Sequence, residues 1–125
     1  MLETLLIHEI VDITLEDGII RTRLKIPFVD LEIARRCVNL RFEAIVDRPY
    51  LMLSDARSMK KITKEAREYL SGKEARDGVT AVAVLVEKPV GRIILNFFLA
   101  INKPLVPTKS FSKEDDAKKW LRQQG

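Results

Sequence analysis

The sequence contains very few of the residues that form disulfides, bind metal ions or act as nucleophiles. Among its 125 residues there is one cysteine, Cys37, and one histidine, His8. A single cysteine excludes an intrachain disulfide and a cysteine-based zinc site, and it is consistent with a reducing cytoplasm. We therefore expect no metal ion and no other cofactor.

The same scarcity bears on catalysis. A histidine that acts as a general base needs a nucleophile and an orienting carboxylate within hydrogen-bonding reach. No such set is recognisable in the sequence, so we expect His8 to be structural and the protein to have no enzymatic activity. Cys37 falls on the predicted buried face of a helix, where a thiol packs as a small hydrophobic group.

The sequence also lacks a hydrophobic run that could cross a membrane. Its longest nearly apolar stretch, residues 93–101, is interrupted by Asn96 and is much shorter than the roughly 20 residues that a spanning helix needs. The start, Met1-Leu2-Glu3, shows no export signal. With 46% hydrophobic and 32% charged residues, the composition predicts one soluble cytoplasmic domain, residues 1–125.

Positive charge is absent from residues 1–18, so the rest of the chain carries all 22 lysines and arginines. A basic body of this kind is compatible with nucleic-acid binding. However, the basic residues alternate with acidic ones, as in residues 64–68, which is typical of solvated helix faces. No nucleic-acid-binding motif accompanies them, and we expect no nucleic-acid partner.

Hydrophobic spacing predicts strands that alternate with helices. Residues 11–15, preceded by apolar residues 5–7, are expected to pair with residues 19–24 across the Asp17-Gly18 turn. Further strands are expected at 50–54, 79–86 and 105–108, and helices at 30–45, 63–70, 89–101 and after Ser112.

Short polar residues mark the starts of three of these helices. Asp30 and Thr63 are predicted N-caps, and Ser112 with Asp115 resembles a capping arrangement. In the first helix, Cys37 is expected on the buried face and Arg41 on the exposed face.

This order predicts an α/β fold. An N-terminal β-hairpin is followed by strands and helices in alternation, so the sheet is mixed, with about five strands and about four helices. In such sheets, ligands and partners meet the chain beyond the carboxyl ends of the strands. The segment from Asp55 to Thr63 is therefore the expected working surface.

The order of elements, with Asp55 ending the central strand, resembles the STAS domain of bacterial anti-sigma-factor antagonists. Several short stretches are similar to small stand-alone STAS-like bacterial proteins of unassigned function: 63–67, 88–92, 102–104 and 107–111. The lipid-binding CRAL–TRIO domains share a related architecture, which is an analogy of fold only.

The resemblance implies a role for the turn after the central strand. In the antagonists this strand ends in Asp-Ser-Ser-Gly, and a partner kinase phosphorylates the second serine. The matching residues here are Asp55, Ala56, Arg57 and Ser58, so arginine stands at the phosphorylated position. A retained switch would have to use Ser58 or Thr63, where nearby lysines would favour a phosphate. Asp55 itself is expected to bond backbone amides in the turn.

A second polar feature is Gly91-Arg92 at the start of the third predicted helix. Gly91 permits close approach of a ligand, and Arg92 is able to hold a phosphate or carboxylate there. The simpler alternative is that Arg92 pairs with a neighbouring acidic residue.

These features leave several hypotheses for function. The leading one is a non-enzymatic regulatory module that binds an unidentified regulatory protein around Asp55 to Thr63. The alternative is a carrier or sensor of a small apolar or lipid-like ligand held between the helices and the sheet. An enzymatic hypothesis requires a polar pocket that joins His8 to Asp55 or Arg92. The apolar helix faces also offer a surface for a homodimer.

Overall fold

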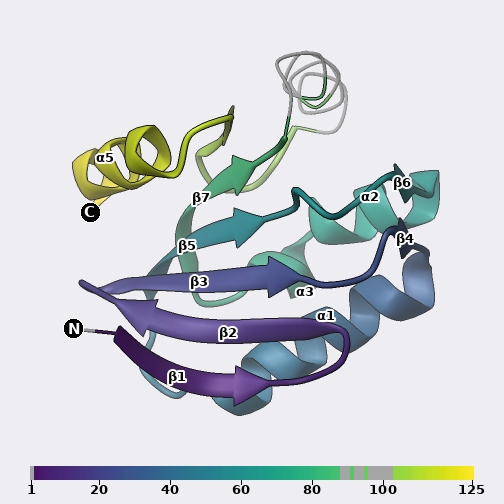
Figure 1. The fold of residues 1–125 in the computed structure, drawn as a ribbon, viewed down its shortest axis with the longest axis horizontal. Helices are drawn as coiled ribbons and strands as arrows, with labels where there is room; N and C mark the ends of the chain where they lie inside the picture. Colours follow the sequence, from purple (N-terminus) through teal and green to yellow (C-terminus); the bar gives the residue numbers. More distant parts are fainter. Residues whose placement is uncertain (1, 88–90, 92–94, 96–102) are drawn as a thin grey trace.

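The fold is built on a mixed six-stranded sheet (Figure 1). The computed structural model describes residues 2–87, 91, 95 and 103–125. The strand order is β1-β2-β3-β5-β7-β8, with β1 to β3 antiparallel and β3, β5, β7 and β8 parallel. The strands are β1 (Leu2–Ile7), β2 (Val11–Glu16), β3 (Ile19–Leu24), β5 (Tyr50–Asp55), β7 (Val79–Leu85) and β8 (Thr108–Phe111).

Two further short strands and four described helices complete the fold. The strands β4 (Phe28–Val29) and β6 (Lys61–Ile62) pair in parallel as a separate small sheet. The helices are α1 (Leu31–Ala44), α2 (Lys64–Leu70), α3 (Lys73–Arg76) and α5 (Glu114–Gln124). None of the described helices is long and apolar enough to span a membrane.

Local sequence signals account for several element boundaries. Asp17 and Gly18 have φ of 52° and 78°, as a two-residue hairpin turn with positive φ at both positions requires. The Asp30 side chain accepts a hydrogen bond from Ile33 N at 2.9 Å, and Thr63 Oγ1 accepts one from Ala66 N at 3.2 Å. The predicted hairpin turn and these two N-caps are confirmed.

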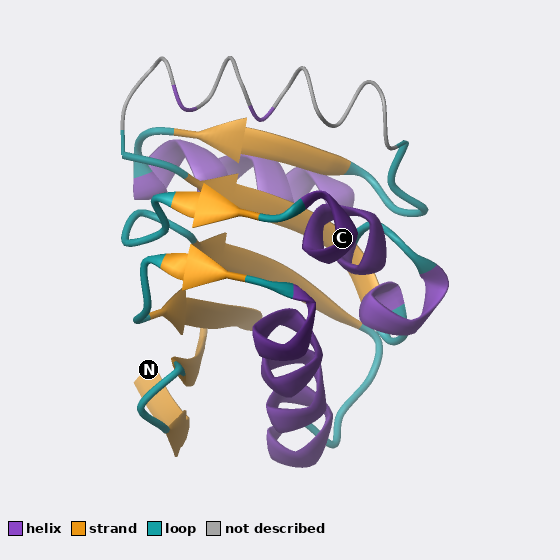
Figure 2. Cartoon of the chain, turned by 90° about the vertical axis from the view of Figure 1, so that its right-hand side faces the viewer, coloured by secondary structure: helices purple, strands orange, loops and turns teal. Residues whose placement is uncertain are grey.

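Helices cover both faces of the sheet (Figure 2). Successive strand residues point to opposite faces, so Met52 packs in a cluster with residues of α1, whereas Leu53 packs in a cluster with Ala117 and Leu121 of α5. β5 and β7 are therefore apolar on both sides, as expected for the middle of a covered sheet.

The structure corrects the predicted C-terminal elements. The last strand is Thr108–Phe111 rather than 105–108, because Pro107 has no amide hydrogen and contributes only its carbonyl, which accepts from Val82 N at 2.9 Å. The expected cap at Ser112 is also wrong. Helix α5 has Lys113 as its N-cap, without a capping side-chain hydrogen bond among the described residues.

Other differences come from short elements. The sheet has six strands rather than about five, and α3, β4 and β6 are not predicted from the sequence. The predicted helix over residues 89–101 lies outside the described residues except for Gly91 and Leu95.

Candidate functional site

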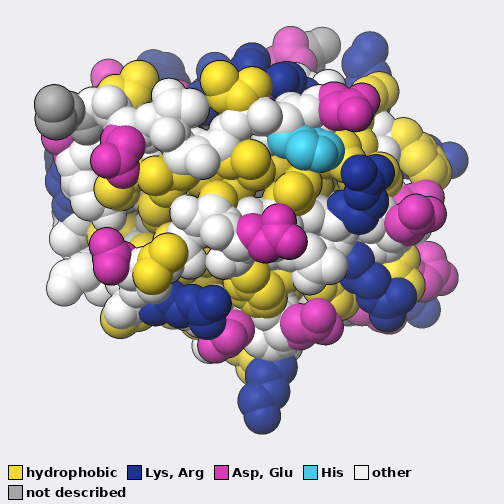
Figure 3. Space-filling view, turned by 90° about the horizontal axis from the view of Figure 1, so that it is seen from below, with side chains coloured by type: hydrophobic (Ala, Val, Ile, Leu, Met, Phe, Trp, Pro, Cys, Tyr) yellow, Lys and Arg dark blue, Asp and Glu magenta, His cyan; other side chains and the backbone are white. Residues whose placement is uncertain are grey.

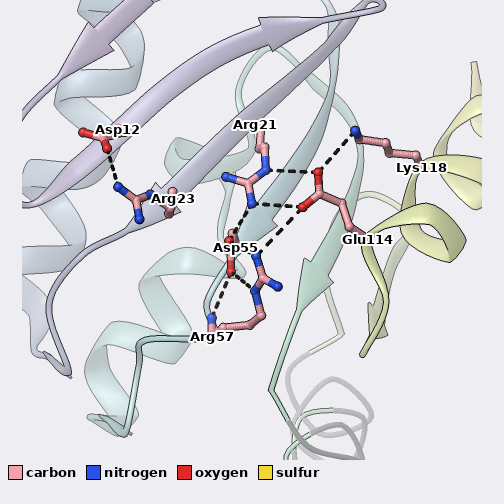
Figure 4. A network of polar contacts seen from close by, with 7 residues as sticks. All are labelled: Asp12, Arg21, Arg23, Asp55, Arg57, Glu114 and Lys118. Carbon is pink, nitrogen blue, oxygen red and sulfur yellow. Dashed lines mark hydrogen bonds and ion pairs between the residues drawn. The ribbon is translucent and has the colours of Figure 1, made fainter. Parts of the chain in front are cut away.

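Asp55 lies at the carboxyl end of β5 and is held by two arginines (Figure 4). Its Oδ1 accepts hydrogen bonds from Arg57 N at 3.1 Å and Arg57 Nε at 3.0 Å. Its Oδ2 accepts from Arg57 Nη2 at 2.8 Å and from Arg21 Nη2 at 2.7 Å. The expected bond from Asp55 to a turn amide is thus present, and the side chain of Asp55 is 4% exposed.

The contacts of Asp55 continue into a larger set of charges, here called the Asp55 network. Arg21 donates to both carboxylate oxygens of Glu114, at 3.0 and 3.3 Å. Lys118 Nζ lies 3.2 Å from Glu114 Oε2 and 3.0 Å from Glu16 Oε1. The network joins β2, β3, β5 and α5 through six residues: Glu16, Arg21, Asp55, Arg57, Glu114 and Lys118.

The network sets the charge of its carboxyl groups. Burial alone would raise the pKa of Asp55, but hydrogen bonds from Arg57 and the charges of Arg21 and Arg57 outweigh it and hold this pKa below its usual value. A hydrogen bond from Arg21 likewise lowers the pKa of Glu114, with help from Lys118 and against partial burial. Both groups are therefore carboxylates at neutral pH.

A cavity of about 170 Å³ lies on the other face of the sheet, against α1, α2 and α3. Most of its wall is apolar, and the strands contribute Val11, Met52, Val82 and Val84. Cys37 and Val38 of α1 and Leu95 also line it. The cavity therefore lies between the helices and the sheet, which is the position that the apolar-ligand hypothesis requires.

Two arginines of this cavity wall, Arg41 and Arg76, have no carboxylate partner in the part of the chain that the structure describes. Arg41 is 6% exposed; its Nη2 donates to the Ala75 carbonyl and its Nη1 lies 3.5 Å from Met52 Sδ. Arg76 follows Ala75 at the end of α3. Among the described residues, neither arginine forms an ion pair, and the Nε of each is buried without an acceptor. Desolvation and the nearby charge of Arg41 lower the pKa of Arg76 to about 10.

The chain also matches a known family model. The model called Domain of unknown function (DUF7793) matches residues 13–124. The chain belongs to the DUF7793 family. Because the match runs from within β2 to the end of α5, it includes the whole Asp55 network and all of the described cavity lining except Val11.

A solved structure supports the fold of the DUF7793 chain. It is an uncharacterized protein from the DUF3478 family with a SpoIIAA-like fold, from Shewanella loihica PV-4. The TM-score is 0.64 at 14% sequence identity, and the alignment covers 89% of this chain and 91% of that chain. The predicted STAS-like α/β fold is confirmed. A comparison with curated proteins gave no match.

In the DUF7793 chain, only part of the predicted surface from Asp55 to Thr63 is exposed, because some of its side chains are bonded within the domain. The Asp55 carboxylate is enclosed by Arg21 and Arg57, and the Thr63 hydroxyl caps α2. The Arg57 side chain is 45% exposed, and Ser58 is exposed. Within the described part of this segment, Arg57 and Ser58 are therefore the predicted site residues that face solvent.

Of the other candidate residues, the structure places His8 and Cys37 but not Arg92. Arg92 lies outside the described residues, so the predicted site at Gly91 and Arg92 stays a prediction. His8 lies between β1 and β2, and its Nδ1 accepts a hydrogen bond from Ile10 N at 3.1 Å. Two strands, β2 and β3, separate β1 from β5. Burial raises the pKa of the Cys37 thiol to about 11, as expected for a residue packed in the core.

The histidine lies near an apolar edge of the domain. In the described part of the chain, β1 pairs with β2 alone, so its outer edge is open. The side chains of Leu2 and Ile7 on this strand are 59% and 73% exposed. Figure 3 shows this side of the molecule, with hydrophobic side chains around the histidine. The homodimer, which was expected to form through the apolar helix faces, stays a prediction.

Sequence reasoning missed the buried arginine of the cavity. Arg41 was expected on the exposed face of the first helix, and this expectation is wrong. A signal was present, because Ala34, Val38, Arg41 and Ile45 follow the spacing of one helix face, and all four are buried. Arg76 gave no such signal, since it belongs to a helix of only four residues.

Proposed function

We propose that this DUF7793 domain is a non-enzymatic carrier or sensor of a small, largely apolar ligand. The observation that carries the proposal is the cavity between the sheet and α1, α2 and α3, with a volume of about 170 Å³. An engineered apolar cavity of about 150 Å³ is known to bind benzene. The ligand is therefore comparable in size to a single ring or a short alkyl chain.

Filling the cavity is expected to abolish binding. Val84 is half-buried on β7 and lines the cavity, so Val84→Phe places a ring inside it. We expect fluorobenzene, followed by ¹⁹F NMR, to bind the wild-type protein and to bind Val84→Phe at least tenfold more weakly. Val46→Phe is the matched control, because Val46 is 87% exposed. Equal binding to both variants, or no binding to the wild type, would contradict the proposal.

A second candidate function is regulatory contact with a partner protein at the exposed part of the 55–63 segment. What favours it is that Asp55 holds the Arg57 side chain through hydrogen bonds at the surface of the loop, while Ser58 stays exposed beside it. A phosphate on Ser58 would lie near the positive charges of Arg57 and Lys60. Both candidate functions assume a cytoplasmic protein. Its partner is then a protein or a small molecule rather than a nucleic acid.

The partner hypothesis predicts selective loss of capture. We expect a protein retained by the immobilised wild-type domain to be lost from the double variant Ser58→Glu, Lys60→Glu. The matched control is Lys119→Glu, which reverses the charge of an exposed residue on α5. Quantitative mass spectrometry of the eluates measures the ratio, and equal capture by all three proteins would exclude this surface.

A further inference from the structure

We propose that the cavity selects an amphipathic anion, whose carboxylate is held by Arg41 and Arg76 while its apolar part fills the remaining space. This inference rests on the proposed function, because it requires that the cavity binds a ligand. It adds the chemical class of that ligand, which is a small organic acid with a ring or short chain.

The first support is the state of Arg41. A guanidinium group has five N–H donors, and burial of a charge is costly unless those donors and that charge are matched. In the described structure, Arg41 donates to one carbonyl and approaches one thioether sulfur, and its guanidinium lies 5.6 Å from the centre of the Phe42 ring. Its Nε has no acceptor, and no carboxylate is among these contacts. The guanidinium of Arg41 loses its water when the protein folds, so the free-energy cost of its desolvation does not recur when a ligand binds. A carboxylate that arrives later gains hydrogen bonds from an already dehydrated donor.

The second support is that another positive charge lines the same cavity. Arg76 contributes to its wall, and its pKa is lowered both by burial and by the charge of Arg41. With a pKa of about 10, Arg76 is still charged at neutral pH. Arg67 of α2 also lines the cavity, and its Nη1 donates to the Ile62 carbonyl at 3.2 Å. The like charges of Arg41 and Arg76 repel each other, and an anion between them replaces this repulsion with two attractions.

The third support is that the described residues provide no counter-ion for these two arginines. Among the described residues, no Asp or Glu forms an ion pair with Arg41 or Arg76. Residues 88–102 cannot supply one, because their sequence contains neither Asp nor Glu. Asp77, the residue after Arg76, instead pairs with Arg48 at 3.1 Å. The counter-charge is therefore left to a ligand.

The rest of the wall determines the other half of the ligand. Most of this wall is apolar, with Val38, Met52, Val82 and Val84 among its residues, and a few hydroxyl groups such as that of Ser54 interrupt it. A group that extends from the carboxylate must therefore itself be largely apolar. A purely polar anion would leave this surface unfilled. A purely apolar molecule would leave the guanidinium donors unmatched.

Benzoate and benzamide provide a matched test, since they share size and shape and differ in charge at pH 7. Binding of each is measured by NMR titration with the wild-type domain. We expect the dissociation constant of benzoate to be at least about tenfold lower than that of benzamide. Hydrogen bonds to charged groups generally increase affinity by this factor or more. In Arg41→Met and in Arg76→Met, benzoate should lose this preference while benzamide keeps its affinity. Arg36→Met, an exposed arginine of α1, should behave as the wild type.

The outcomes separate the two proposals. If benzoate and benzamide bind the wild type equally, the inference of an anionic ligand is wrong and the proposed function stands. If neither compound nor fluorobenzene binds, the proposed function itself fails. If Arg41→Met does not fold, the wild-type ratio and Arg76→Met still decide the inference. Retained preference in Arg76→Met would limit the carboxylate site to Arg41 and overturn the two-arginine arrangement.

Discussion

Leu53→Ala is expected to lower the free energy of unfolding by about 3–5 kcal/mol, the largest effect of a single substitution that we predict. Leu53 is fully buried in β5, between the parallel neighbours β3 and β7. It packs in one cluster with Ala81, Ala83 and Leu121. Two of these neighbours are alanines, whose short side chains are unable to move into the space that the leucine leaves. The space that the substitution creates therefore stays empty, and the cost of this void adds to the lost transfer free energy of the leucine side chain.

Urea unfolding followed by circular dichroism measures this effect. Leu105→Ala serves as the matched control, because Leu105 is 62% exposed and its truncation is expected to change stability by less than about 0.5 kcal/mol. If Leu53→Ala costs less than about 1 kcal/mol, α5 does not cover the sheet in the way described.

The parts of this fold that sequence reasoning predicted well depend on neighbours in the chain. The turn at Asp17-Gly18 follows from two adjacent residues that tolerate positive φ. The caps at Asp30 and Thr63 act on amides three residues away. The apolar run of β7 indicates a central strand because burial on both faces removes alternation. Each of these signals is contained in a short window of sequence.

The parts that were missed depend on contacts between distant segments. Arg21 meets Asp55 and Glu114 across separations of 34 and 93 residues, which no spacing rule reveals. The Asp55 carboxylate is placed correctly at the end of its strand, but its contact with Arg21, which also binds Glu114 of α5, requires the tertiary fold. Arg41 was assigned to solvent because it is charged, whereas its place on the helix face and the carbonyl of Ala75 hold it inside.

Asp55→Asn is expected to lower the free energy of unfolding by about 2–3 kcal/mol, the second largest effect. Loss of one member of a buried ion pair generally costs about 3–5 kcal/mol, because the remaining charge stays buried without its partner. The expected value is lower here, since Arg21 keeps Glu114 and the Arg57 side chain is 45% exposed. Asp77→Asn is the control: its pair with Arg48 is exposed and contributes about 0–1 kcal/mol.

The pH dependence of this difference identifies charge as its cause. Because the folded-state pKa of Asp55 is below that of an unfolded aspartate, about 3.9, its contribution is fully present above that value. The contribution is lost as the pH falls through the lower folded-state pKa. Asparagine does not titrate, so the stability gap between the wild type and Asp55→Asn should be constant above about pH 5 and narrow below about pH 4. A gap that stays constant at acidic pH would assign the effect to hydrogen-bond geometry instead, since geometry alone gives no dependence on proton binding.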